Sequence, residues 1–367
     1  RLKSNVHLYL HSGAWIRAVP EFTPDNYPAQ HNGDSSFIFI GEASHVRISG
    51  RGFIDGNGMA VRTLNAKANI KLLRTADVTD LRIDDVYFID SARWSLHLLY
   101  AKDVSLNRFK LINDLRGGPD PADPDLLLPT VTNTDGVDID ASQNVTVEGA
   151  FIYTGDDAIS PKVSNYMNLK RPTYGLQIKN NVLWTLKAAL KVGDETQMDI
   201  GDIRFENNDI IRADRFVALW AGDETLIHNI DAIHNRAEFI GGNYNERYFY
   251  FRILLRDGTS APGWIDQVNV KDFYVLNEAA QASTIEGFDE SHRVTNVTFD
   301  NIVINGVQAA ESADVPLTFR NAYYNNVVFL PSGTIYNGTP PIQTLQIAAP
   351  TNNAHTNNPA PEISGTA

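Results

Sequence analysis

Short strand-like triplets, most of them with two apolar residues flanking a polar one, recur along this chain and constrain its fold more than any other feature. Such alternation is typical of a β-strand with one buried face. The triplets begin at Val46, Leu81, Val104, Val145, Leu176, Ile203, Val268, Val297 and Val327. Leu81 and Val104 are 23 positions apart, a spacing in the range of solenoid repeats. The chain therefore repeats one structural unit.

The type of unit follows from what surrounds the triplets. Many are followed by Asn or Asp and a second apolar pair, as in "RFENNDIIRA". Amphipathic helical patterns are scarce, which argues against alternating strands and helices, and no four-strand blade unit indicates a propeller. The pattern predicts an all-β, single-stranded, right-handed parallel β-helix over residues 1–331. Residues 332–367 are rich in Thr, Asn and Pro and are expected to form a C-terminal strap or linker.

Composition limits the classes of partner. The net charge of -13 argues against nucleic acid, which requires a basic face. The absence of cysteine excludes disulfides and thiolate metal sites. No apolar run approaches the ~20 residues of a membrane-spanning helix, so we expect no membrane association. The sequence opens at Arg1 without Met or a signal peptide, which fits a processed or truncated chain.

Two acidic segments carry the candidate chemistry. One is "NTDGVDID", with Asp135, and the other is "GDDAISPK", with Asp156 and Asp157. Asp135 and Asp156 are 21 residues apart, close to one coil, and stacked coils lie only ~5 Å apart. Crowded carboxylates raise each other's pKa, so one can hold a proton while another is ionised. Glycoside hydrolysis requires such an acid and such a base.

Strand geometry restricts this arrangement. Adjacent residues on a regular strand face opposite sides, so Asp156 and Asp157 need a turn or bulge, which Gly155 permits. Gly136 is expected to do the same for Asp135. Asx turns between coils, or a calcium site, remain alternative interpretations of these aspartates.

These motifs resemble the polygalacturonases, glycoside hydrolase family 28. "LKSNVHLYLHSGAWI", "GRGFIDGNG" and "NVTFDNIVING" are similar to the family's coils, and the resemblance covers residues 2 to about 310. It implies the pectin-lyase-like β-helix and an inverting reaction. It also implies that Asp156 is the general acid and that Asp135 and Asp157 activate the water.

The departures from the family concern the substrate. The family's Gly-His-Gly motif is missing, and Ala188 stands where the histidine is expected. No Arg-Ile-Lys motif, which grips the galacturonate carboxylate, is visible. An extra coil, "YGLQIKNNVLWT", gives some resemblance to the dextranases and isopullulanase of family 49, which share the fold and the aspartates but act on neutral α-glucans.

Further residues are candidates for substrate binding. By resemblance, Asn133 orients a neighbour or contacts sugar, and Lys162 follows the aspartate pair as in the family. Lys191 and Glu195 lie one coil further along, where sugar binding and a solvated turn are both open. Trp220 either stacks on sugar or enters the core. The remaining candidate, His97, alternates with Leu96 and Leu98 and therefore faces the other way, toward the groove or solvent.

We predict an inverting, secreted glycoside hydrolase of a pectic or other acidic polysaccharide, acting as a monomer without a metal or cofactor. Secretion is inferred from this function. One alternative keeps the chemistry and changes the substrate to a neutral α-glucan. A lyase is a second, although it usually needs calcium or a Lys or Arg base. A non-catalytic carbohydrate-binding β-helix is the third, since fold does not fix function.

Overall fold

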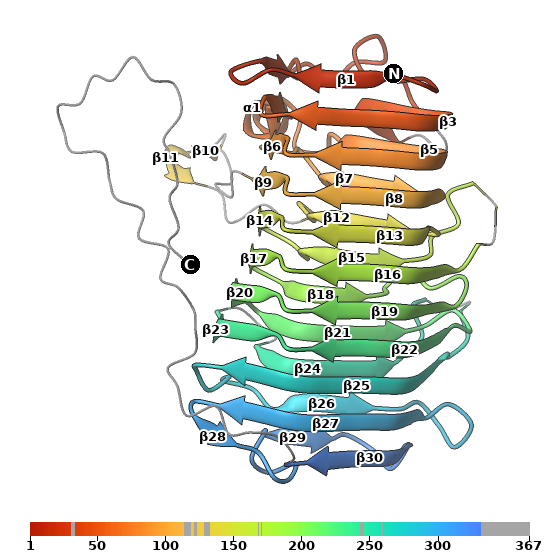
Figure 1. The fold of residues 1–367 in the computed structure, drawn as a ribbon, viewed down its shortest axis with the longest axis vertical. Helices are drawn as coiled ribbons and strands as arrows, with labels where there is room; N and C mark the ends of the chain where they lie inside the picture. The colour runs from red at the N-terminus through yellow and green to blue at the C-terminus, as the bar shows by residue number, and fades with distance from the viewer. Residues whose placement is uncertain are drawn as a thin grey trace, which may run out of the picture.

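The chain folds into a right-handed parallel β-helix, an elongated stack of coils in which each strand pairs with its equivalent one coil away (Figure 1). The computed structural model describes residues 1–30, 34–113, 119–120, 123–127, 133–167, 169, 171–242, 246–257 and 260–331. The predicted strap at 332–367 lies outside these residues. Three strand faces run along the stack, and we number them 1 to 3.

Face 1 carries the sequence triplets. Val46 pairs with Leu81, Leu81 with Val104, and so on, so the triplets stack in register along the axis. The strands of face 1 are β1 (His7–Leu10), β3 (Ser35–Gly50), β5 (Ile70–Asp84), β8 (Ala101–Asn107), β13 (Gln143–Glu148), β16 (Thr173–Lys179), β19 (Ile200–Glu206), β22 (Leu226–Ile233), β25 (Trp264–Val275), β27 (Val294–Ile304) and β30 (Tyr324–Leu330). The β-helix predicted from periodicity is thereby confirmed, and β22 adds one coil that the triplets did not reveal.

Face 2 receives the chain after each turn from face 3. Its strands are β7 (Leu96–Leu99), β12 (Val137–Asp140), β15 (Ile159–Lys162), β18 (Ala188–Val192), β21 (Arg215–Ala221), β24 (Arg247–Ile253), β26 (Ser283–Glu286) and β29 (Leu317–Phe319). The N-terminal part of β5 also joins this face, by pairing with β7. Both acidic motifs therefore lead into neighbouring strands of one face, β12 and β15.

Face 3 is formed by short strands between faces 1 and 2. They are β2 (Trp15–Arg17), β4 (Phe53–Asp55), β6 (Tyr87–Ile89), β9 (Lys110–Ile112), β14 (Phe151–Thr154), β17 (Val182–Thr185), β20 (Asp209–Ala213) and β23 (Arg236–Ile240). Outside the faces lie the helix α1 (Gly58–Leu64), the antiparallel pair β10 (Pro119–Asp120) and β11 (Asp123–Leu127), and β28 (Val307–Gln308), which pairs with β27.

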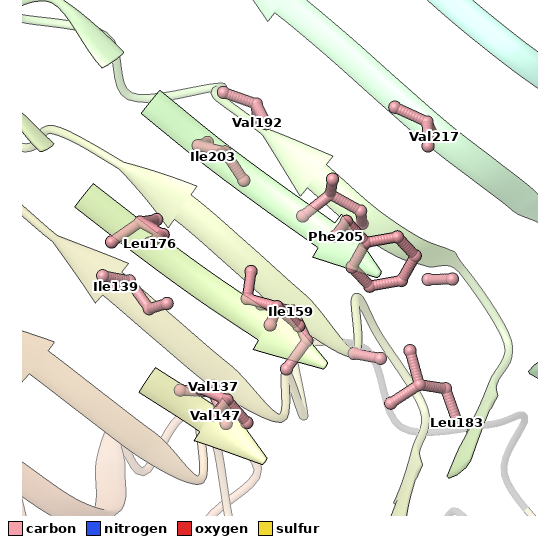
Figure 2. Close-up of a cluster of buried hydrophobic side chains, with 14 of the residues drawn as sticks. Val137, Ile139, Val147, Ile159, Leu176, Leu183, Val192, Ile203, Phe205 and Val217 are labelled. Atoms are coloured by element: carbon pink, nitrogen blue, oxygen red, sulfur yellow. The ribbon is translucent and has the colours of Figure 1, made fainter. Parts of the chain in front are cut away.

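The inward side chains of all three faces form one continuous core (Figure 2). At the corner between faces 1 and 3 the core ends in a ladder of buried asparagines. The Asn181 amide donates to Asn208 at 2.9 Å, and the Asn208 amide donates to Asn235 at 3.0 Å. Each also bonds a backbone carbonyl, so these buried polar groups are satisfied. The Asn that follows many triplets is therefore a corner residue of the solenoid.

Candidate active site

Three aspartates meet where the chain passes from face 3 to face 2. Asp156 and Asp157 lie in the turn between β14 and β15, and Asp135 lies just before β12, one coil away. One carboxylate oxygen of each lies within 4.8 Å of the others. The backbones are in register here, since the Gly136 N–H donates to the Asp157 carbonyl at 2.9 Å. The structure thus gathers the predicted carboxylates into one cluster.

A turn allows Asp156 and Asp157 to share this cluster. The carboxylate of Asp156 accepts hydrogen bonds from the backbone N–H groups of Asn133 at 2.8 Å and Asp157 at 3.0 Å. The Asp157 carboxylate accepts one from the Ala188 N–H at 2.8 Å. Gly136 contributes by closeness, because a Cβ there would lie 2.3 Å from the Ala158 carbonyl oxygen. Glycine at 136 therefore lets two coils approach where the carboxylates meet.

Burial and mutual repulsion set the protonation of the cluster. Asp135 is buried, and burial, Asp138 and Asp156 together raise its pKa well above the usual range. Burial and the neighbouring Asp157 also raise the pKa of Asp156. Asp156 is the least buried of the three side chains. A proton can therefore be retained within the cluster at a pH where ordinary aspartates are ionised.

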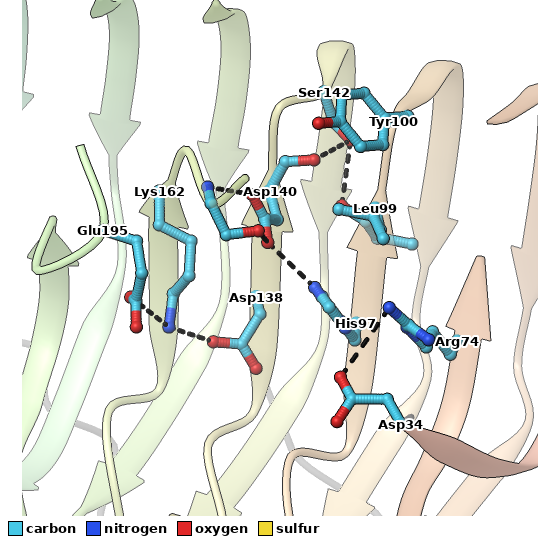
Figure 3. A network of polar contacts seen from close by, with 12 residues as sticks. Asp34, Arg74, His97, Leu99, Tyr100, Asp138, Asp140, Ser142, Lys162 and Glu195 are labelled. Atoms are coloured by element: carbon cyan, nitrogen blue, oxygen red, sulfur yellow. Dashed lines mark hydrogen bonds and ion pairs between the residues drawn. The ribbon is translucent and has the colours of Figure 1, made fainter. Parts of the chain in front are cut away.

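A buried ion-pair chain lies beside the cluster (Figure 3). The Lys162 Nζ is 2.8 Å from Asp138 and 3.6 Å from Glu195, and it lies 4.0 Å from the centre of the Trp94 ring. Burial raises the pKa of Asp138 to about 7, although Lys162 opposes the shift. Lys162 and Glu195, both predicted to bind substrate, thus contact each other, and the Lys162 ammonium is already paired.

Lys191 and Trp220 form a second cation–aromatic contact on face 2. The Lys191 Nζ lies 4.0 Å from the Trp220 ring centre and 2.9 Å from Asp194. Trp220 is half-buried and packs on the outer side of the face against Tyr250. Its side chain therefore points out of the core. Lys191 itself is buried, so it does not occupy the solvated turn that the sequence left open.

His97 lies beneath the surface of face 2 and contacts Asp140 (Figure 3). It points away from the core, as its alternation with Leu96 and Leu98 indicates, but it is fully buried. Its Nε2 lies 3.0 Å from Asp140 Oδ2, and burial lowers its pKa to about 4. The expectation that His97 faces the groove or solvent is wrong, because its side chain is buried and Trp94 and Tyr166 pack against its ring.

Two arginines that the sequence reasoning missed extend the site along face 2. Arg215 and Arg247 are paired in register on β21 and β24, and both are buried. The Arg215 Nη2 lies 3.7 Å from Asp157 Oδ1, and Arg215 also pairs with Ala188 in the strand register. Neither belongs to an Arg-Ile-Lys motif. Only their position marks them in the sequence, because each is the first residue of the face 2 strand in its coil.

Comparisons with known proteins bear on this site. Residues 21–181 match the model of Glycosyl hydrolases family 28. A probable polygalacturonase of Vitis vinifera is 23% identical over 200 residues, which cover 51% of this chain and 38% of that protein. A polygalacturonase of Ralstonia nicotianae is 27% identical over 196 residues, which cover 49% of this chain and 34% of that protein. The chain thus spans less than two-fifths of the length of these curated relatives.

Solved structures share the fold. The family 28 exopolygalacturonase of Yersinia enterocolitica has a TM-score of 0.67 and 18% identity, covering 89% of this chain and 70% of that one. The exopolygalacturonase of Thermotoga maritima has a TM-score of 0.64 and 16% identity, covering 84% and 81%. The polygalacturonase of Erwinia carotovora has a TM-score of 0.59 and 18% identity, covering 89% and 84%.

One further observation concerns membranes. None of the helices in the described ranges is long and apolar enough to cross a bilayer.

The family match includes Asp135, Asp156 and Asp157, and the structural likeness extends over most of the described coils. The comparisons thus show that residues 21–181 are similar to family 28 of the glycosyl hydrolases and that the chain shares its right-handed parallel β-helix with solved polygalacturonases.

Proposed function

We propose that this chain hydrolyses glycosidic bonds in an acidic, pectic polysaccharide, with inversion at the anomeric carbon. The observation that carries the proposal is the cluster of three carboxylates, whose oxygens lie within 4.8 Å of one another and two of which have raised pKa values. The reaction needs one protonated and one ionised carboxyl group, and such a cluster can supply both at a pH where ordinary aspartates are ionised.

The roles follow from the contacts of each carboxyl. Asp156 is the most accessible of the three and has a raised pKa, which suits the acid that protonates the leaving oxygen. The Asp157 carboxylate accepts the Ala188 N–H and lies near Arg215, contacts that suit an anion. Asp157 and Asp135 then activate a water molecule that attacks the opposite face of the sugar.

The distance between the acid and base carboxyl groups bears on whether the anomeric configuration is inverted or retained, and the outcome can be measured. Inverting enzymes usually separate their acid and base carboxyls by about 6.5–9.5 Å, and retaining enzymes by about 5–5.5 Å. The closest oxygens here lie nearer the shorter range. We base inversion on the resemblance to family 28 and on two candidate bases that can flank one water. Proton NMR of the first product decides, because an α-linked substrate yields a β-anomer on inversion and an α-anomer on retention.

An acidic substrate is supported by the cations on face 2. Lys191 is on β18, the first face 2 strand after the carboxylate cluster. Arg215 and Arg247 are on the next two strands, β21 and β24. Buried guanidinium groups recognise carboxylates through paired hydrogen bonds. The relatives named polygalacturonase support the same class of substrate. Since its polymer lies outside cells, we expect the protein to act there.

The test is a reducing-sugar assay of the wild type and Asp156→Asn on polygalacturonate, rhamnogalacturonan, dextran and pullulan. We expect cleavage of a pectic polymer and a loss of about 10²–10⁴ in kcat for Asp156→Asn. Exposed Asp25 provides a matched control, and Asp25→Asn should keep full activity. Full activity of Asp156→Asn, or unsaturated products, would refute the assignment. If only dextran or pullulan is cleaved, the hydrolytic reaction stands and its substrate is a neutral α-glucan.

Metal dependence of the rate distinguishes acid–base catalysis by the three carboxylates from a metal site formed by them. Three clustered carboxylates could also hold a cation such as calcium. If they act as acid and bases, chelation with EDTA leaves the rate unchanged. A rate that falls with EDTA and returns with calcium would make the cluster a metal site instead.

A further inference from the structure

A row of mostly apolar side chains, three of them exposed and two half-buried, crosses face 3, on the other side of the corner that holds the carboxylate cluster. Ile112, Tyr153, Trp184, Arg212 and Phe239 are consecutive partners on β9, β14, β17, β20 and β23. Ile112, Trp184 and Phe239 are 40%, 37% and 41% exposed. At ~4.8 Å per coil the row is about 19 Å long. We call these five residues the face 3 row.

The side chains of the face 3 row are arranged as a stacking surface with one cation. The rings of Tyr153 and Trp184 are 4.9 Å apart, and the Arg212 guanidinium lies 5.3 Å from the centre of the Phe239 ring. Within the described part of the chain, no carboxylate forms an ion pair with Arg212. The guanidinium donors are thus held against an aromatic ring without an acidic partner.

The row begins beside the candidate active site. Tyr153, on β14, precedes Asp156 in the following turn by three positions, and the hydroxyl of Thr185, the neighbour of Trp184, donates to the Asp156 carbonyl. A polymer that leaves the carboxylate cluster over this corner would therefore meet the aromatic pair first. The row then continues parallel to the axis of the β-helix (Figure 1).

We propose that the face 3 row is an auxiliary binding site for an anionic polysaccharide, which holds a segment of the polymer that is not being cleaved. The proposal rests on the function proposed above. The C–H faces of sugar rings pack on exposed aromatic rings, and a sugar carboxylate accepts hydrogen bonds from Arg212.

A polymer fits this surface better than a second folded protein does. The row is one side chain wide, and ionised groups flank it, including the Asp209–Arg236 pair at 2.6 Å and Glu238 on β23. A protein interface would remove these charges from water at a cost, whereas a single polysaccharide strand leaves them hydrated.

Binding is measured separately from cleavage, by electrophoresis of the Asp156→Asn protein in native gels with and without polygalacturonate. Added to that background, Trp184→Ala should weaken the affinity roughly three- to tenfold. Arg212→Gln should weaken it as well, whereas Glu238→Gln should strengthen it by removing a like charge. Trp15→Ala is the matched control, because Trp15 is an exposed tryptophan of the same face outside the row, and it should bind like the parent.

Several outcomes would overturn the proposal. Unchanged retardation of Trp184→Ala and Arg212→Gln, with thermal unfolding confirming an intact fold, would show that the row does not bind the polymer. Equal weakening by Trp15→Ala would show that the effect is not specific to the row. If the active wild type cleaves polygalacturonate while Trp184→Ala leaves its KM for the polymer unchanged, the auxiliary site fails and the proposed function stands. Absence of cleavage by the wild type would instead remove the proposed function.

Discussion

Replacing Asp156 with Asn should abolish activity and at the same time stabilise the fold at neutral pH. The three carboxylates have oxygens within 4.8 Å of one another. Two ionised groups at that distance repel each other by about 3 kcal/mol at an effective dielectric constant of about 20. Because the raised pKa values of Asp135 and Asp156 show that part of this repulsion is relieved by protonation, the recoverable energy is smaller.

A hydrogen bond offsets part of the gain. The Asp156 carboxylate accepts two backbone N–H groups, and an asparagine amide can accept only one of them through its oxygen, so about 1 kcal/mol is lost. The net expectation is a stabilisation of about 1–2 kcal/mol at pH 7, which corresponds to a rise in Tm of about 1–3 °C for a chain of this length.

The sign of the pH dependence is part of this prediction. A carboxyl whose folded-state pKa is raised destabilises the folded state only when it ionises, so the penalty grows as pH rises from about 4 through the raised pKa. The advantage of Asp156→Asn should therefore be present at pH 7 and absent near pH 3.5. Thermal unfolding followed by circular dichroism at both pH values measures it, with Asp25→Asn as the control for net charge. A variant no more stable than wild type at pH 7, or equally advantaged at both pH values, would refute the repulsion.

Three further outcomes are expected. Asp138→Asn removes the charge that contributes most to raising the pKa of Asp135, so the acidic limb of the kcat/KM profile should move to lower pH; an unchanged or upward limb would contradict the role of Asp135 as base. His97 has a folded pKa of about 4 against 6.5 when unfolded, so it reduces wild-type stability by up to about 3 kcal/mol as pH falls through that window. Urea unfolding at pH 7 and 4 should therefore show the deficit of His97→Gln shrinking in acid, and a constant deficit would mean that His97 titrates normally. Gly136→Ala places a Cβ 2.3 Å from the Ala158 carbonyl oxygen and should cost about 1–3 kcal/mol together with most of the activity, whereas a wild-type Tm and rate would show that the coils can separate without harm.

The β-helix could be predicted from sequence because most coils contain the same short pattern of alternating apolar and polar residues. The triplets, such as Val145–Val147, stack in register on face 1, and the Asn that follows them turns the corner. The coil that escaped notice contains Ile230-Asp231-Ala232, where alanine weakens the apolar alternation although both apolar residues are buried. Periodicity detects a strand only when its inward side chains are large.

The carboxylate cluster could also be predicted, because a spacing of one coil places residues side by side whatever the details of the turn. Sequence spacing could not show the surroundings. Arg215 reaches Asp157 because β15, β18 and β21 stack one on another, although the two residues are far apart in the chain. The ring of His97 is similarly covered by Trp94 and by Tyr166, which lies in the connection after β15, two coils away.

The sequence by itself therefore determined the repeat, the all-β class and which aspartates share a coil boundary, since each depends on residues close in the chain or one period apart. Only the tertiary structure decided which charges are buried together and which side chains remain exposed. Lys162, which the sequence predicts to bind substrate, is paired with Asp138 and Glu195, because β12, β15 and the turn after β18 bring these side chains together. Protonation and burial depend on neighbours in space, and a stack of coils sets those neighbours across strands rather than along them.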